Sequence, residues 1–358
     1  MVFIKCFAYN QISLTLFRLA LYNNINILLE RMMEMELPLV SIIIVSYNES
    51  EYLNQALDSV LTQTYKNIEI IIGDDGSNDG SDALIKSFSR KHNINFFIMD
   101  RPSNNESIVP SIRVSNVIKK ALSMAKGKYI CLLSGDDYFC DDKKIEDAVI
   151  HLEEMPTCSA YVSGYQKVYS NGNIEKRFSH FPSKLFLSGA YLHVSCFCFR
   201  REVYDKKRIC PRFCDDVGLL FSIAAIGRFA YANTITFAYR QREKSIMHEA
   251  KKLELDMMEV LLLQDCLCEK LFCKEAKSRF YKPLMQCYHS RKEIAKYPNL
   301  LQNSKVLSHD IIGFLNGYDS QSFLAKVKFH FFLLSAFFEH FYYKCIRKAY
   351  SILNRKDD

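Results

Sequence analysis

The chain has 358 residues, of which 49% are hydrophobic and 24% charged, and its formal net charge is +7. This length and composition are ordinary for a globular protein and allow one large α/β domain with an accessory part. The thirteen cysteines are scattered and form no CxxC pair. This spacing is poor for zinc ligands and does not suggest a disulfide framework, and it favours buried free thiols in a reducing cytoplasm.

The N-terminal segment precedes the first regular pattern. Residues 1–37 mix apolar and polar residues without a helix or strand period, and we assign this extension no function. Met32, Met33 and Met35 stand just before the first predicted strand, so an over-long start is an alternative interpretation of the extension.

Strands and helices alternate from Pro38 onward. Apolar, largely β-branched runs predict strands at 40–46, 68–72, 96–99 and 129–133, and helical spacing of apolar residues predicts helices at 53–61, 83–88 and 112–125. This alternation predicts an α/β fold with a parallel sheet and right-handed crossovers.

Two of these strands end in paired acids. Asp74 and Asp75 follow the second strand, and Asp136 and Asp137 follow the fourth. Ligands of open α/β sheets bind at the carboxyl ends of the strands. The first pair alone is at least as well explained as a polar turn, whereas the apolar strand before the second pair makes a simple turn the weaker explanation there. Together the two pairs predict one cleft for a metal and a phosphorylated ligand.

The region from about 161 to 239 is less regular. Asn171-Gly172 is a hairpin turn signal, and residues 193–200 resemble a short strand. Asp215 and Asp216 open an apolar helix that runs to about Ile226. After Gln241 the pattern becomes helical and charged to about residue 314.

Residues 38–247 resemble a family 2 glycosyltransferase with the GT-A fold, a Rossmann-like nucleotide-binding sheet with flanking helices. The matching motifs, in order, are Val40-Ser41-Ile42-Ile43-Ile44-Val45-Ser46-Tyr47-Asn48, Gln63-Thr64-Tyr65, Asp74-Asp75-Gly76-Ser77, Gly127-x-Tyr129-Ile130, Ser134-Gly135-Asp136-Asp137 and Asp215-Asp216. On this basis we expect a catalytic domain at 38–247, a helical accessory region at 248–320 and an amphipathic tail at 321–358.

The resemblance implies inverting transfer of a sugar from a nucleotide-diphosphate sugar to an acceptor hydroxyl. It assigns Asp136 and Asp137 to a divalent cation, Mg²⁺ or Mn²⁺, which carboxylates and phosphate oxygens would hold together. Ser134 stands where the family often has the first acid of an Asp-x-Asp motif. Asp136 and Asp137 would therefore share the metal and ribose contacts, and the sequence leaves open which of them binds the metal directly.

The nucleoside is assigned to the first two strand ends. Asp74 and Asp75 would accept hydrogen bonds from the base or ribose, and Tyr47 would border the base. A half-buried structural tyrosine is an equal alternative for Tyr47. A helix cap explains Asp79 fully.

Asp216 is the candidate catalytic base, because the family has a Glu-Asp pair here and its second acid is the base. A helix N-cap is the alternative, and the two roles are compatible. Arg240 and Arg242 resemble the basic segment that closes over the diphosphate, with a surface loop as the alternative. Arg113 cannot be aligned with the family and receives no role.

The C-terminal tail is aromatic and basic. Residues 329–338 are strongly apolar but too few to span a bilayer, which needs about 20 residues. The flanking cations between Lys326 and Lys348 favour an interfacial helix on an anionic membrane, and a core helix that caps the catalytic domain is the alternative.

The predicted partners are a nucleotide-diphosphate sugar donor and a glycan or lipid-linked acceptor in surface polysaccharide synthesis, at the cytoplasmic face of a membrane. No nucleic-acid partner is expected, since no nucleic-acid-binding motif occurs. Two other functions stay open. Ser134 makes a donor-binding protein without transfer conceivable, and the acid-bound metal also suits a nucleotidyltransferase, although Tyr47-Asn48-Glu49-Ser50 is not its Gly-rich loop.

Overall fold

The computed structural model describes residues 37–101, 110–178, 182–190, 193–205, 216–242, 252–270, 272–297, 301 and 310–353. By its contacts the chain divides into two units, Met1–Pro38 and Leu39–Asp358. The predicted extension at 1–37 lies outside the described residues except for Leu37.

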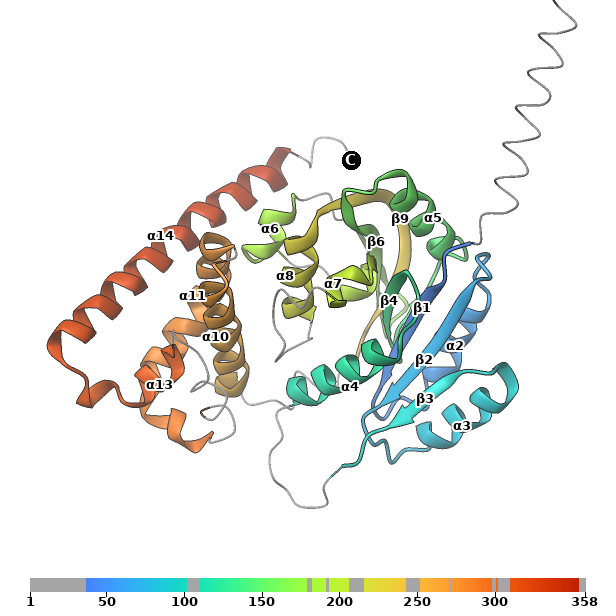
Figure 1. Ribbon diagram of the computed structural model, residues 1–358, viewed down its shortest axis with the longest axis horizontal. Coiled ribbons are helices and arrows are strands. Elements are labelled where there is room, and N and C mark those ends of the chain that lie inside the picture. Colours follow the sequence, from blue (N-terminus) through green and yellow to red (C-terminus); the bar gives the residue numbers. More distant parts are fainter. Residues whose placement is uncertain are drawn as a thin grey trace, which may run out of the picture. The chain divides into compact units, whose positions relative to one another are not determined.

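The parallel half of the sheet has the strand order β3-β2-β1-β4 (Figure 1). Its strands are β1 (Val40–Ser46), β2 (Ile68–Asp74), β3 (Asn95–Ile98) and β4 (Tyr129–Ser134). The interiors of β1, β2 and β4 are buried, as expected for strands covered on both faces. The predicted strands and their parallel pairing are confirmed.

The register of these strands sets the position of the acids. Ser46 pairs with Asp74, and Val45 pairs with Ser134. The carboxyl ends of β2, β1 and β4 therefore lie side by side at one level. The residues that follow each strand emerge at the same edge of the sheet.

The other half of the sheet is mostly antiparallel and continues from β4 in the order β8-β6-β9-β5, with β7 paired to β6. Its strands are β5 (Tyr138–Phe139), β6 (Cys158–Tyr169), β7 (Ile174–Arg177), β8 (Phe197–Arg200) and β9 (Arg228–Gln241). The hairpin predicted at Asn171-Gly172 joins β6 to β7, and Gly172 has a φ of +83° that favours glycine. Strand β5 directly follows Asp136 and Asp137 and pairs with the end of β9, so this end of β9 lies close to the two acids.

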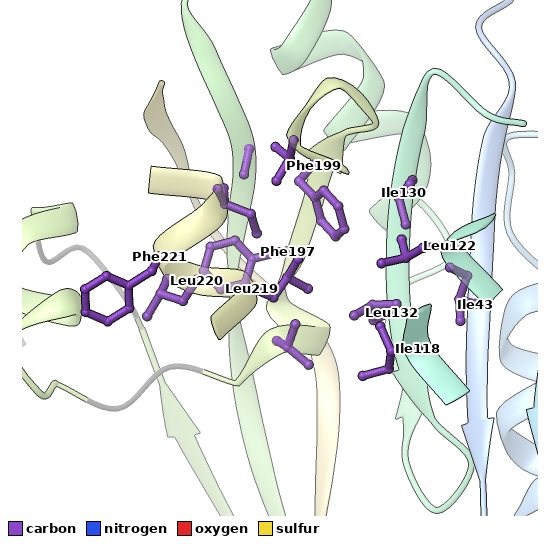
Figure 2. Close-up of a cluster of buried hydrophobic side chains, with 14 of the residues drawn as sticks. Ile43, Ile118, Leu122, Ile130, Leu132, Phe197, Phe199, Leu219, Leu220 and Phe221 are labelled. Atoms are coloured by element: carbon purple, nitrogen blue, oxygen red, sulfur yellow. The ribbon is translucent and has the colours of Figure 1, made fainter. Parts of the chain in front are cut away.

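Helices cover the sheet and close its core. They are α2 (Leu53–Leu61), α3 (Ser81–His92), α4 (Pro110–Met124), α5 (Lys144–Glu154), α6 (Ser183–Leu187), the 3₁₀ turn η1 (Val194–Cys196), α7 (Glu202–Asp205) and α8 (Asp216–Ile226). Buried side chains of β1, β4 and α4 face those of β8 and α8 in Figure 2, which labels Ile43, Ile118, Leu122, Ile130, Leu132, Phe197, Phe199, Leu219, Leu220 and Phe221. One hydrophobic core thus joins the two halves of the sheet.

The C-terminal region is helical, as predicted. It comprises α10 (Lys252–Cys268), α11 (Cys273–His289), η2 (Arg291–Lys296), α13 (Ile311–Asn316), η3 (Tyr318–Ser320) and α14 (Phe323–Leu353). Helix α14 lies along α11 (Figure 1) and has 31 residues, far more than the apolar run that marked it in the sequence. Among the described residues, no helix is both long and apolar enough to cross a membrane.

Candidate functional site

The loops after β1 and β2 are tied together by short polar side chains. The backbone N–H of Asn48 donates to Ser77 Oγ at 2.9 Å, and the N–H of Asn78 donates to Asn48 Oδ1 at 2.9 Å. The N–H of Ser50 donates to Asp79 Oδ2 at 2.9 Å. Asn48 has a φ of +53°, a left-handed conformation that asparagine tolerates. These bonds fix the edge of the site before any ligand arrives.

Asp74 uses its carboxylate within its own turn. It is fully buried, and its Oδ1 accepts hydrogen bonds from the N–H groups of Gly76 at 3.0 Å and Ser77 at 2.8 Å. Its Oδ2 accepts from the Ser77 hydroxyl at 2.6 Å. The polar-turn interpretation therefore describes what this side chain does in the structure.

Asp75 is held by an arginine that sequence reasoning left without a role. Arg113 on α4 donates from Nε to Asp75 Oδ2 at 2.8 Å and places Nη2 2.6 Å from Oδ1. Both side chains are buried. Burial raises the pKa of Asp75, although the hydrogen bonds and charge of Arg113 act in the opposite direction. Asp75 is thus a rigidly oriented carboxylate at the end of β2.

Tyr47 lies at the end of β1 beside a second arginine. The guanidinium carbon of Arg101 lies 3.8 Å from the centroid of the Tyr47 ring. The segment after β3 is close to the turn after β2, since a Cβ on Gly76 would lie 2.8 Å from the carbonyl oxygen of Met99. The Arg101 guanidinium therefore lies over the Tyr47 ring at the same edge as Asp75.

The second acid pair meets the end of β9. Asp137 is fully buried, and its Oδ1 accepts from the backbone N–H of Arg240 at 2.8 Å. The Arg240 guanidinium donates to the backbone carbonyl of Asp136, and Arg242 forms an ion pair with the Asp136 carboxylate. Burial, and then the charge of Asp136, raises the pKa of Asp137 well above its usual range.

Arg240 and Arg242 are placed by aromatic rings. The guanidinium of Arg240 lies 5.0 Å from the Tyr52 ring centroid and 4.8 Å from that of Tyr138, and it donates to Gln55 Oε1. The guanidinium of Arg242 lies 5.4 Å from the Tyr52 ring centroid. The structure thus brings both predicted phosphate-binding residues to the second acid pair.

Glu49 is a third carboxylate at this place, and sequence analysis did not select it. It is 3% exposed, and its Oε1 lies 3.5 Å from Arg242 Nη2. A Cβ on Gly135 would lie 2.4 Å from Oε2, so the glycine allows this close approach. Burial, followed by the charge of Asp136, raises the pKa of Glu49 well above its usual range. The only sequence signal was its position in the loop directly after β1.

His193 lies beside Asp137 of the second acid pair. Its Nδ1 accepts from the N–H of Ser195 at 3.2 Å, so the neutral ring carries its proton on Nε2, 4.0 Å from Asp137 Oδ2. The ring lies 4.8 Å from Phe237 and 4.7 Å from Tyr239, centroid to centroid. Burial lowers the pKa of His193 to about 4, although the charge of Asp136 acts in the opposite direction. The imidazole is therefore neutral at pH 7.

For the candidate base, the structure describes only the backbone. Asp216 is the first residue of α8, as the sequence predicted. Its side chain and Asp215 lie outside the described residues.

The residues of the second acid pair suit a hard divalent cation. Glu49 Oε2 and Asp137 Oδ2 are buried oxygens without a hydrogen-bond partner, and Asp136 adds a third carboxylate. Across the described part of the chain, no three acidic, histidine or cysteine residues are already arranged around one metal position. In Mg²⁺ sites one or two carboxylates commonly hold the ion and substrate phosphates complete its shell.

Comparison with known proteins identifies the fold, and part of the chain matches a family model. Residues 1–349 of TarS from S. aureus, in complex with UDP-GlcNAc, match 78% of this chain and 88% of that one with a TM-score of 0.54 at 14% sequence identity. The fold is therefore of the GT-A type. Residues 41–208 match the family model described as Glycosyl transferase family 2.

Relatives in sequence agree with this assignment. GlyG, a glycosyltransferase of Streptococcus pneumoniae serotype 4, is 24% identical over 291 residues, which cover 73% of this chain and 93% of GlyG. TuaG of Bacillus subtilis, named provisionally as a teichuronic acid biosynthesis glycosyltransferase, is 30% identical over 148 residues, 41% of this chain and 55% of TuaG. An uncharacterised protein of Mycobacterium tuberculosis is 31% identical over 140 residues, 39% of this chain. The chain spans only 38% of that mycobacterial protein's length.

Proposed function

We propose that the chain transfers a sugar from a nucleotide-diphosphate sugar to an acceptor hydroxyl with inversion at the anomeric carbon. One observation carries this proposal. Three neighbouring parallel strands end at one level, and buried carboxylates follow each of them, with two arginines from β9 beside them. Such an edge offers oxygens for a nucleoside and a cation together with positive charge for a diphosphate.

The nucleoside would bind at the first acid pair. Asp75, oriented by Arg113, would accept a hydrogen bond from the base or the ribose, and Tyr47 would border the base. Asp74 would contribute to this pocket by fixing the turn at Gly76 and Ser77 with its hydrogen bonds. Asp136 follows β4, which is separated from β2 by β1 and ends at the same edge of the sheet, and it would reach the ribose as well as the cation.

The diphosphate would bind at the second acid pair. Asp136 and Asp137 would hold Mg²⁺ or Mn²⁺, which when bound neutralises charge on the leaving diphosphate. Arg240 and Arg242 would pair with phosphate oxygens. Because Arg242 now pairs with Asp136 and lies near Glu49, its guanidinium must shift toward the phosphates when the donor binds.

Asp216 would act as the general base. Its carboxylate would take the proton of the acceptor hydroxyl while that oxygen forms a bond to the anomeric carbon. The bond from that carbon to the diphosphate breaks on the opposite face. The amino end of α8 favours the ionised carboxylate that this role needs.

The acceptor is proposed to be a growing surface polysaccharide or a lipid-linked glycan, and the name of TuaG supports this class. In this proposal residues 38–247 form the catalytic domain, 248–320 the helical accessory region and 321–358 the amphipathic tail.

A thermal-shift screen of the full chain with UDP-, GDP-, dTDP- and CMP-sugars tests the proposal, each with Mg²⁺, Mn²⁺ or chelator. One nucleotide class should raise the melting temperature, and more so with metal. Release of the matching nucleoside diphosphate from that donor should follow when a glycan acceptor is added. If no nucleotide sugar raises the melting temperature under any condition, the proposed function is wrong.

A further inference from the structure

Helix α14 has two apolar faces, and only one is used inside the fold. Its inner face packs against the helical region through Phe329, Leu333, Ala336 and Tyr343, which are at most 8% exposed. The Tyr343 hydroxyl donates to Glu275 Oε1 on α11 at 2.8 Å. The core-helix alternative for the tail therefore describes this inner face.

The opposite face is apolar and open to solvent. At about 100° per residue it forms one stripe, centred half a turn away from the buried residues. The large side chains of this stripe are 48% to 83% exposed, and they are Phe323, Leu324, Phe331, Leu334, Phe338, Phe341 and Tyr342. At the same spacing Val327, Cys345 and Ala349 fill its remaining positions. From Phe323 to Ala349 this stripe contains no charged residue.

Lysines border the stripe. On the helical wheel Lys344 and Lys348 lie along one edge and Lys328 along the other, and all three are exposed. Glu339 is the single acidic residue of α14, next to the Lys328 edge. An apolar stripe between cations matches a helix that lies at the surface of an anionic membrane.

The dimensions support a surface position rather than insertion across the bilayer. At 1.5 Å per residue the 31 residues of α14 give a helix of about 46 Å. In the described part of the chain no helix qualifies as a span, and the inner face of α14 is committed to α11. Exposed contiguous apolar patches of this kind are rare on monomeric proteins unless they bind something.

We propose that the outer face of α14 docks onto an anionic lipid membrane, with its aromatic side chains at the boundary of headgroups and acyl chains and its lysines at the headgroups. This inference uses neither the donor site nor its chemistry. Its failure would leave the proposed function intact.

Sedimentation of the full chain with vesicles tests the proposal. The protein should bind vesicles rich in phosphatidylglycerol, bind phosphatidylcholine vesicles more weakly, and be partly released by high salt. The double variant Phe338→Ser/Phe341→Ser should weaken binding about tenfold or more. Lys344→Gln/Lys348→Gln should weaken it chiefly for anionic vesicles. Ile174→Ser, an equally exposed apolar residue on β7, is the matched control and should change nothing.

A fluorescent reporter keeps the test valid if the double variant folds poorly. The chain contains no tryptophan, so Phe338→Trp introduces a single probe into the outer face. With vesicles its emission should shift to shorter wavelength and be quenched by brominated lipid, while that of Ile174→Trp should stay unchanged. Equal behaviour of the two probes would overturn the proposal. So would self-association of the wild-type protein that Phe338→Ser/Phe341→Ser abolishes, if vesicles do not bind, because the face would then join two copies.

Discussion

The two acid pairs of the site have the same sequence pattern but opposite surroundings. Asp74 accepts three hydrogen bonds from its own turn, and Asp75 is held by Arg113. In the second pair, Asp137 keeps one buried oxygen without a partner. Burial and the charge of Asp136 hold the pKa of Asp137 well above its usual range. Both carboxylates of the first pair are thus held by groups of the protein, whereas in the second pair Arg242 pairs with Asp136 and leaves Asp137 Oδ2 without a hydrogen bond.

This difference separates recognition from charge neutralisation. A carboxylate with a fixed partner keeps one orientation, which suits reading a nucleoside. Carboxylates that repel one another in a buried place favour a ligand that brings a cation. The same local motif can therefore serve both functions, and the contacts from distant elements decide between them.

The largest effect should come from an acid outside both pairs. Asp216→Asn keeps the ability to cap α8 but cannot accept a proton, so turnover should fall by about 10²–10⁴-fold. Donor affinity and melting temperature should change little. Single-turnover kinetics, calorimetry and melting curves measure these three quantities. A variant that melts several degrees lower but turns over normally per folded molecule would make Asp216 only a cap.

The buried contact of Arg113 with the first pair predicts a stability effect. Arg113→Met leaves the buried carboxylate of Asp75 without its partner, so unfolding should become easier by about 3–5 kcal/mol. Nucleoside affinity should fall as well. Lys86→Met, which breaks the exposed pair with Asp82, is the control and should cost no more than about 0.5 kcal/mol. Urea denaturation of both variants measures the two losses of unfolding free energy. Equal losses would show that the Arg113–Asp75 pair contributes no more than an exposed ion pair.

A smaller effect should appear in the pH dependence of stability, through His193 beside the second acid pair. His193 has a pKa of about 4 when folded and about 6.5 when unfolded, so the unfolded state binds the additional proton between these values. Stability from this group is complete above pH 6.5, and up to about 3 kcal/mol is lost as the pH falls toward 4.

His193→Asn removes that titration, so the difference in unfolding free energy between wild type and variant should shrink over the same interval. The raised pKa values of Glu49 and Asp137 give a slope of opposite sign in both proteins, so it largely cancels in the difference. A difference that stays constant between pH 4 and 6.5 would show that the imidazole is not buried and neutral.

Local signals in the sequence were enough to predict the first four strands, their parallel direction and the acid pairs that follow two of them. Arg113 could not be predicted, because it meets Asp75 across 38 residues and nothing beside it in the sequence marks it. Glu49 and His193 likewise become part of the site only when β1, β4 and β9 meet. In the tail, the polar residues Glu339 and His340 directly follow the apolar run 329–338. In the structure His340 donates to the carbonyl of Ser278, so this polar residue belongs to the packed face of a longer helix.

Calorimetric titration of a nucleoside diphosphate, with and without Mn²⁺, tests the division between the two pairs most directly. In the wild type the affinity should depend strongly on the metal. Asp137→Asn should abolish that dependence but leave binding of the free nucleoside unchanged. Asp75→Asn should weaken nucleoside binding and leave the metal dependence of the affinity unchanged. Equal affinity of the wild type in metal and in chelator, or loss of metal dependence in both variants alike, would contradict the account.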